Sequence, residues 1–340
     1  MGLKPLVGHF AKIGLGLALL IAAACIDYRR WMQWSTGLYL LALLALSLVL
    51  VPGIGSRVNG ARRWFQFDAL PFAVQPSEFA KLAVILGVAT YVTRTSNIGK
   101  SFGKTFLPAA LLILVPASLI LVETDLGTFL LVSMMGFVLL QLAGMKLQHL
   151  LWLSFCALPM LVYLVIEKLD YVVARFTGYG DPDPSSQVGF GLSALSAGGV
   201  TGVGLGGGRT KLFFLAEAEN DFILSVVGEE LGFIGTTAVV LLFTTLLWSG
   251  GRILLGIHDR FGFFVVAGVL LTIATQALIN LAVATGCVPV KGMPLPFVSA
   301  GGSSLTALCL AVGIVISVAR HSARSPAPPD WAMNAEGSSE

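Results

Sequence analysis

Apolar segments separated by short polar turns dominate the residue pattern of this 340-residue chain. Each segment is long enough to cross a bilayer core of about 30 Å as a helix, and none alternates apolar and polar residues as barrel strands do. Backbone groups in lipid must bond within their own segment, which favours helices. The nine segments lie at residues 11–27, 36–53, 72–93, 107–122, 126–145, 147–167, 222–248, 262–285 and 303–320. The pattern therefore predicts an all-α polytopic membrane protein, a helical bundle of nine transmembrane helices.

The composition excludes several classes of protein. Hydrophobic residues make up 56% of the chain and charged residues only 11%, whereas globular proteins carry about 25% charged residues. A soluble enzyme, a secreted disulfide scaffold and a disordered protein are excluded. The net charge of +3 is too small to indicate nucleic-acid binding. The four cysteines show no CxxC spacing, so we expect buried apolar side chains rather than disulfides or metal ligands.

Two polar stretches set the predicted domain organisation. Residues 168–221 form the longest stretch between spans and are rich in Gly, Ser and Asp, so we expect a large extracytoplasmic loop there. Residues 322–340 are polar and contain Ser-Pro-Ala-Pro-Pro, which is typical of a disordered tail, here on the cytoplasmic side. Residues 1–321 therefore form one predicted transmembrane domain.

Lys and Arg in alternate loops predict the orientation, because cytoplasmic loops carry more of them. The set assigned to the cytoplasm contains Arg29, Arg30, Arg94, Lys100, Lys104, Lys146, Arg252, Arg260, Arg320 and Arg324. The set assigned to the exported face contains Arg57, Arg62, Arg63, Lys168, Arg175, Arg209, Lys211 and Lys291. So many exported cations oppose the usual bias. They either meet an anionic ligand or pair with nearby acids and lipid headgroups, and both interpretations stay open.

Two motifs carry charge close to the exported surface. Arg62 and Arg63 precede a tryptophan, an arrangement suited to phosphate binding and, nearly as well, to anchoring at the membrane surface. Glu78 and Lys81 lie three residues apart in a predicted helix, so they can pair on one face. We expect a structural ion pair there.

Helix caps are expected at three places. Gln75 or Ser77 can satisfy free N–H groups at the start of one helix, and Ser303 or its neighbour those of the last helix. Asp125 follows Glu123 in a tight turn, and such a carboxylate pair can hold a hard cation. Capping of the next helix by Asp125 is the better explanation.

A glycine-rich stretch leads into the span at 222–248. It contains Gly-Gly-Gly at 206–208 but no Gly-Lys-Ser/Thr, so it is not a P-loop. Asp221 lies at the exported start of the span, where a carboxylate can cap the helix or take a proton from an incoming hydroxyl. Glu229 and Glu230 lie about 12 Å deeper. We expect them to orient helices through buried hydrogen bonds rather than to catalyse.

The segment at 285–304, before the last helix, combines three prolines with repeated glycines. Irregular backbone survives at membrane depth only where protein or water covers it, so we expect a re-entrant segment. Lys291 lies within it. A lysine is costly at that depth, which favours contact with an anion over a purely structural loop.

Together these stretches resemble the SEDS family, the shape, elongation, division and sporulation proteins of bacteria. The motifs are Asn-Gly-Ala-Arg-Arg-Trp at 59–64, Gln-Pro-Ser-Glu-Phe-Ala-Lys at 75–81, Asp-Leu-Gly-Thr at 125–128, Glu-Asn-Asp-Phe-Ile at 219–223, Gly-Glu-Glu-Leu-Gly at 228–232, and Pro-Leu-Pro-Phe-Val-Ser-Ala-Gly-Gly-Ser-Ser at 294–304. The resemblance extends to about residue 320. The motifs are more similar to those of the division member than to those of the elongation member.

The resemblance implies a peptidoglycan glycosyltransferase that polymerises lipid II at the outer face of the bacterial cytoplasmic membrane. The family's essential aspartate falls on Asp221, which would act as general base with inversion at the donor anomeric carbon. Its arginines fall on Arg62 and Arg63, and its loop lysine on Lys291. The other residues expected to bind substrate are Arg209, Lys211 and Glu217.

The resemblance also implies cofactors and partners. Mg²⁺ or Mn²⁺ is expected to assist the departure of the diphosphate, and no organic cofactor is expected. The expected partners are a class B penicillin-binding protein, other membrane proteins of the division or elongation machinery, membrane lipid and the lipid II substrate, but no nucleic acid.

Two departures from the family pattern stand out. The family normally has ten helices, and the segment at 11–27 resembles its second, so the first looks absent. Glu123-Thr124 replaces the more usual Gln-Pro before Asp125.

Two rival functions remain. One is a lipid II flippase or another membrane transporter, in which a proton relay or substrate path would use Glu78, Lys81, Glu229 and Glu230. The other is a non-catalytic scaffold that recruits a synthase.

Overall fold

The computed structural model describes residues 4–58, 61–66, 73–95, 101–146, 148–149, 186–208, 221–288 and 292–322. The chain divides into two compact units, each made of separate stretches of sequence. Unit 1 comprises Met1–Met145, Trp248–Thr272 and Gly302–Glu340. Unit 2 comprises Lys146–Leu247 and Ile273–Gly301.

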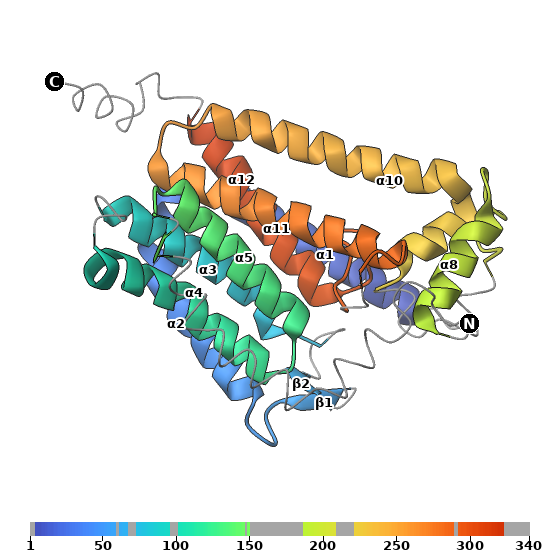
Figure 1. The fold of residues 1–340 in the computed structure, drawn as a ribbon, viewed down its shortest axis with the longest axis horizontal. Coiled ribbons are helices and arrows are strands. Elements are labelled where there is room, and N and C mark those ends of the chain that lie inside the picture. Colours follow the sequence, from blue (N-terminus) through green and yellow to red (C-terminus); the bar gives the residue numbers. More distant parts are fainter. Residues whose placement is uncertain are drawn as a thin grey trace. The chain divides into compact units, whose positions relative to one another are not determined.

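Helices make up nearly all of the described structure (Figure 1). The first part of the chain forms α1 (Lys4–Cys25), α2 (Tyr28–Val49), β1 (Ser56–Val58), β2 (Ala61–Trp64), α3 (Pro76–Arg94), the π-helical turn η1 (Phe102–Phe106), α4 (Leu107–Val122) and α5 (Leu126–Leu142). The later part forms α8 (Gln187–Gly198), α10 (Ile223–Leu255), α11 (Arg260–Ala284) and α12 (Gly302–Ser322). Within these described residues, six helical stretches are long and apolar enough to cross a membrane.

Eight of the nine predicted spans contain a helix, and the remaining one, 147–167, lies outside the described residues except for 148–149. The predicted start of the second span at residue 36 is wrong, because α2 already begins at Tyr28. Asp27 caps it there by accepting a 2.9 Å hydrogen bond from the backbone N–H of Arg29. The cap, rather than the onset of apolar residues, therefore decides where α2 begins.

Unit 1 is built from helices packed in pairs. α1 packs along α12, α2 on α3 and α4 on α5, and Figure 1 shows the last pair side by side. Small residues allow this close approach: a Cβ at Gly136 of α5 would lie only 2.7 Å from Ile113 of α4. Such small residues are common where membrane helices touch, because packing rather than the hydrophobic effect holds them together.

The ends of the unit 1 helices meet as their charges predict. Ser317 of α12 donates a 2.6 Å hydrogen bond to the carbonyl of Ile26, between α1 and α2. Arg320 donates to the carbonyl of Ala24, and the ring of Tyr28 stacks on Phe261 of α11. These contacts join three chain segments that were all assigned to the cytoplasmic side.

A short antiparallel hairpin, β1 and β2, follows α2 at the other end of unit 1. Arg57 pairs with Arg62, and Val58 with Ala61. The hairpin was not predicted, although Asn-Gly, the dipeptide between the strands, is typical of two-residue hairpin turns.

Unit 2 contains α8, a 12-residue helix inside the stretch predicted as one large loop. Its local core is formed by Phe222 and Val283, with Phe190, Val226, Ile279 and Val288 packed against them. The predicted disordered tail falls almost entirely outside the described residues, which end at Ser322.

Candidate functional site

In unit 1 the side chain of Arg63 holds the turn between α4 and α5. Its Nε donates to the carbonyl of Glu123 at 3.0 Å. Its Nη2 donates to the carbonyl of Thr124 at 2.6 Å and lies 3.2 Å from the Thr124 hydroxyl. Thr124 has a φ of +65°, which is uncommon for a residue other than glycine. Arg63 therefore stabilises a backbone conformation that threonine would otherwise avoid.

Glu123 lies beside this contact with its side chain only 1% exposed. Neither of its carboxyl oxygens has a hydrogen-bond partner among the described residues. Burial, and then the negative charge of Asp125, raise the pKa of Glu123 to about 9, while Arg63 opposes the shift. The side chain is therefore a neutral acid at pH 7.

Asp125 caps α5, as predicted. Its carboxylate accepts hydrogen bonds from the backbone N–H of Thr128 at 3.0 Å and from the Thr128 hydroxyl at 2.9 Å. The side-chain amide of Gln75 lies 3.4 Å from the same carboxylate. The prediction that Gln75 or Ser77 caps α3 is wrong, since Gln75 makes no such bond and the Ser77 hydroxyl has no partner among the described residues.

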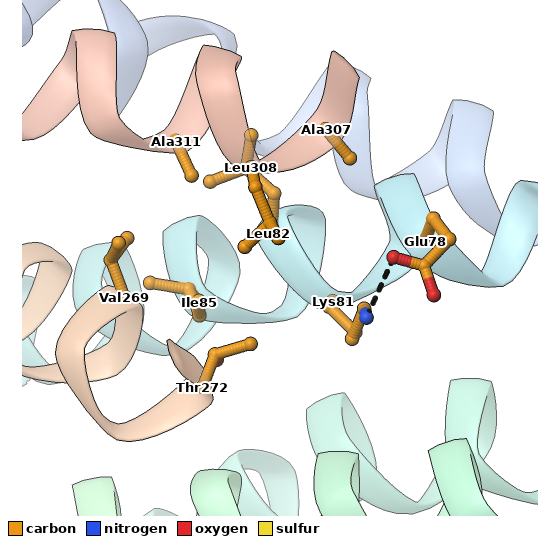
Figure 2. A pocket seen from close by; sticks show the side chains of 9 residues that line it. All are labelled: Glu78, Lys81, Leu82, Ile85, Val269, Thr272, Ala307, Leu308 and Ala311. Atoms are coloured by element: carbon orange, nitrogen blue, oxygen red, sulfur yellow. Dashed lines mark ion pairs between the residues drawn. The ribbon is translucent and has the colours of Figure 1, made fainter. Parts of the chain in front are cut away.

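The ion pair between Glu78 and Lys81 is confirmed. The Nζ of Lys81 lies 2.8 Å from Oε2 of Glu78, and both side chains are 4% exposed. The pair lines a small cavity, whose lining side chains are drawn in Figure 2. The cavity has a volume of about 20 Å³, the size of about one water molecule. Apart from the pair and Thr272, the cavity is lined by apolar side chains of α3, α11 and α12. The pair links successive turns of α3, and a role in a proton relay stays a prediction.

An apolar groove of about 270 Å³ lies between α2 and α3, with Leu310 of α12 also in its lining. Leu38, Leu41 and Ala45 line it from α2, and Phe65 lines it next to the hairpin that carries Arg62 and Arg63. Its lining residues are almost all apolar. The arginine-bearing hairpin lies next to one part of its wall, at Phe65.

In unit 2, Asp221 lies two residues before α10 and is half-buried. Its backbone carbonyl accepts a 3.0 Å hydrogen bond from the side-chain amide of Asn280 on α11. A Cβ placed on Gly292 would lie 3.4 Å from Oδ2 of Asp221, so the carboxylate rests against this glycine. The loop before α12 therefore forms one wall of the space around Asp221.

The helix that follows Asp221 is broken at Gly232, where φ is +67° and ψ is −160°. In an uninterrupted helix, the N–H groups of Phe233 and Ile234 would bond to the carbonyls of Glu229 and Glu230. Here the glycine redirects all four of these groups.

The loop at 199–204 satisfies the redirected groups. It supplies two donors and two acceptors. The bonds are Val203 N–H to Glu229 O at 3.0 Å, Gly204 N–H to Glu230 O at 3.0 Å, Phe233 N–H to Gly199 O at 2.9 Å and Ile234 N–H to Val200 O at 3.2 Å. A broken membrane helix needs such replacement partners, because lipid offers none.

The side chain of Glu229 is 4% exposed and lies against Gly208, where a Cβ would come within 2.8 Å of its Oε2. Glu230 is half-buried. The backbone carbonyls of both residues hold the loop at 199–204. The predicted role of the two carboxylates in orienting helices stays a prediction.

The predicted site residues thus fall into three groups. Unit 1 contains Arg62, Arg63, Glu78 and Lys81, and unit 2 contains Asp221, Glu229 and Glu230. Arg209, Lys211, Glu217 and Lys291 lie outside the described residues. Asn280 was not predicted. The available signal was an amide within the apolar segment 262–285, because polar groups in membrane helices are costly and usually face the protein interior.

A family model matches almost the whole chain. It is that of the FtsW, RodA and SpoVE family, described as cell cycle protein, and it covers residues 7–324. Stage V sporulation protein E of Bacillus subtilis is 40% identical over 314 residues, which are 91% of this chain and 85% of the relative. The probable peptidoglycan glycosyltransferase FtsW of Geobacter metallireducens is 39% identical over 318 residues, 92% of this chain and 84% of the relative.

Solved structures match as well. A chain from a structure described as "Structural coordination of polymerization and crosslinking by a peptidoglycan synthase complex" aligns with a TM-score of 0.78 and 31% identity, over 94% of this chain and 90% of that chain. The rod shape determining protein RodA of Thermus thermophilus aligns with a TM-score of 0.69 and 28% identity, over 94% and 89%. The resemblance predicted from the motifs is confirmed.

Proposed function

This chain belongs to the FtsW, RodA and SpoVE family of cell cycle proteins, and we propose that it is a peptidoglycan glycosyltransferase that polymerises lipid II. It is a multi-pass helical membrane protein. The observation that carries the proposal is the family match over residues 7–324, because it includes all the candidate site residues. Relatives named peptidoglycan glycosyltransferase FtsW, at 36–39% identity, support the division-type assignment.

Asp221 is the proposed general base. It removes the proton from the 4-hydroxyl of the acceptor sugar while that oxygen attacks the anomeric carbon of the donor, with inversion. The bond to undecaprenyl pyrophosphate breaks, and this group leaves with the electron pair. One carboxylate suffices, because a diphosphate needs no proton from the enzyme in order to leave. The half-buried position of Asp221 ahead of α10 supports this role.

Cations must neutralise the charge that grows on the leaving diphosphate. Arg62, Lys291, Arg209 and Lys211 are the proposed contacts. Arg63 is less suited, since three of its contacts are made with the α4–α5 turn. Glu217 remains a proposed contact of a sugar hydroxyl. The apolar groove between α2 and α3 is the proposed place of a polyprenyl chain, because its lining matches a hydrocarbon.

The described residues do not offer a convincing site for Mg²⁺ or Mn²⁺. No group of three or more His, Cys, Asp or Glu side chains within them could hold a metal ion. The acid pair of Glu123 and Asp125 fits poorly, because Asp125 already accepts hydrogen bonds from Thr128 and the cationic Arg63 lies beside the pair. A divalent cation stays a prediction, and no step above depends on it.

A class B penicillin-binding protein is the proposed partner and the bacterial cytoplasmic membrane the proposed location. The similarity to a chain of a peptidoglycan synthase complex supports the partner. Further division or elongation proteins are proposed as additional partners.

The test is polymerisation of lipid II in liposomes by the purified full chain with its class B partner. The wild-type protein is expected to produce glycan strands, and Asp221→Asn to lose at least about 100-fold in rate. Asp27→Asn is the matched control, since Asp27 lies between α1 and α2 in unit 1 and should leave the rate unchanged.

The same liposomes separate the rival functions. Lipid II scrambling without strand formation would identify a flippase. Full polymerisation by Asp221→Asn would contradict the assigned base, and cell-wall synthesis that survives this change in cells would favour a scaffold.

A further inference from the structure

Asn280 is a buried amide near the C-terminal end of an apolar helix. It lies on α11 and is 1% exposed. Its Nδ2 donates two hydrogen bonds, to the carbonyl of Asp221 at 3.0 Å and to that of Met293 at 2.9 Å. Both partners are carbonyl oxygens, which only accept, so the nitrogen rather than the oxygen of the amide must face them.

These two bonds join segments that have no regular ladder to hold them. Asp221 lies in the turn before α10, and Met293 lies in the irregular segment before α12. Each carbonyl needs a partner once buried, because an unpaired buried polar group is costly. One side chain therefore locates both segments against α11.

The result is a defined position for the Asp221 carboxylate. Met293 follows Gly292, whose φ is +58° and whose α-carbon faces Oδ2 of Asp221 closely enough that a Cβ would lie 3.4 Å from it. Further along the same loop, the Ser299 hydroxyl accepts a 2.8 Å hydrogen bond from the N–H of Leu295. The loop is thus fixed at Met293 and again at Leu295, one and three residues after the glycine.

An apolar contact works in the same direction. Phe222, next to Asp221, is 1% exposed and packs against Val283, about one turn beyond Asn280 on α11. The backbone around Asp221 is therefore held by a hydrogen bond on one residue and by core packing on the next.

We propose that Asn280 is a positioning residue for the Asp221 carboxylate, acting through the two carbonyls that it bridges. The inference rests on the proposed function, in which Asp221 is the general base. A displacement of about 1 Å in a reacting group can cost about 100-fold in rate. Loss of the two hydrogen bonds from Asn280 leaves the carboxyl group of Asp221 itself unchanged. It frees the backbone of Asp221 and the facing loop at Met293.

The experiment compares Asn280→Ala, Asn280→Asp and Asp221→Asn in the full chain with its class B partner, with lipid II as substrate. Thr285→Ala is the matched control, since Thr285 is exposed just beyond the end of α11. Among the described residues its hydroxyl bonds only to the carbonyls of Leu281 and Ala282 and to Cys287. The readouts are kcat, KM, the pH profile and the thermal midpoint.

Asn280→Ala is expected to lower kcat about 10- to 100-fold and to leave KM within about threefold, because ground-state binding is kept. Thr285→Ala is expected to match the wild type. Asn280→Asp places a carboxylate against two carbonyls and regains one donor only when protonated, so its rate relative to the wild type should rise as the pH falls.

The outcomes separate the two proposals. A kcat above half the wild-type value in Asn280→Ala, or a loss confined to KM, overturns the positioning role even where Asp221→Asn is inactive. Full activity of Asp221→Asn overturns the assignment of Asp221 as general base instead, and absence of strand formation by the wild type overturns the proposed function. If Asn280→Ala does not fold, the equal-sized Asn280→Asp decides: a rate that follows the wild type at every pH overturns the proposal.

Discussion

The backbone N–H of Gln75 donates a 3.0 Å hydrogen bond to the hydroxyl of Ser303, although 228 residues separate them in the chain. The same hydroxyl donates to the carbonyl of Ala73 at 2.8 Å. Ser303 was expected to cap its own helix, α12; instead its hydroxyl holds the segment that leads into α3. The buried ion pair of Glu78 and Lys81 lies within the first two turns of α3.

Ser303→Ala is expected to destabilise unit 1 by about 1–3 kcal/mol, because two part-buried hydrogen bonds of about 0.5–1.5 kcal/mol each are lost together. The measurement is the free energy of unfolding in detergent micelles. Ser304→Ala is the control: Ser304 is also buried, and the described part of the chain shows no hydrogen bond from its hydroxyl. Equal losses in the two variants would show that the bridge contributes nothing specific.

Arg63→Ala is expected to lower the free energy of unfolding by about 1.5–3 kcal/mol, because hydrogen bonds from a charged group are among the stronger ones. Arg63→Lys should recover little of this, since an ammonium cannot reproduce the planar fork that reaches Glu123 and Thr124. Thermal unfolding measures both.

Arg62→Ala is the matched change for Arg63, because neighbouring residues of a strand point to opposite faces and the described residues show no side-chain hydrogen bond of Arg62. It should leave the unfolding midpoint close to the wild-type value. A larger drop in the unfolding midpoint for Arg62→Ala than for Arg63→Ala would refute the role of Arg63 in holding the turn between α4 and α5.

Glu123 makes stability depend on pH. Its pKa rises from 4.5 to about 9 on folding, so between these values the unfolded chain has lost a proton that the folded chain keeps. The free energy of unfolding should therefore fall as the pH rises through this window, by up to about 1.4 kcal/mol per pH unit. Glu123→Gln removes the titrating group and should flatten the curve.

The measurement is the unfolding midpoint of wild type and Glu123→Gln between pH 5 and 8.5. The unfolding midpoint of Glu123→Gln should exceed that of the wild type increasingly toward the alkaline end, and the two midpoints should be nearly equal at the acidic end. Parallel curves would mean that the acid is ionised in the folded protein.

Gly232→Ala is expected to lower the free energy of unfolding by more than about 1–3 kcal/mol, the usual range for a strained backbone residue. Its φ is positive, and a Cβ would also collide with Val200 and Gly202 of the loop. Gly251→Ala, on the same helix with nothing within 4 Å of the added carbon, should be neutral or should stabilise the protein by up to about 1 kcal/mol. Thermal unfolding of the two variants side by side tests the helix break.

The sequence predicted the helices, the Asp125 cap and the Glu78–Lys81 pair, because each depends on residues close together in the chain. The length of an apolar segment indicates a membrane span. Two charged residues three positions apart in a helix are predicted to share one face. The family also followed from local motifs.

The remaining features depend on distant partners. Arg63 reaches Glu123 across 60 residues, and Asn280 reaches Asp221 across 59. No periodicity reports such pairings. The break in α10 was missed for the same reason: Gly232 sits in an apolar run, and only the loop at 199–204 reveals that its helix is interrupted.

That interruption also limits how the protein can vary in evolution. Four amide–carbonyl pairs align 199–204 with 229–234 one position at a time. A single inserted or deleted residue on either side would put every donor opposite the wrong acceptor. Natural variation in these two stretches should therefore appear as substitutions, while gaps accumulate elsewhere.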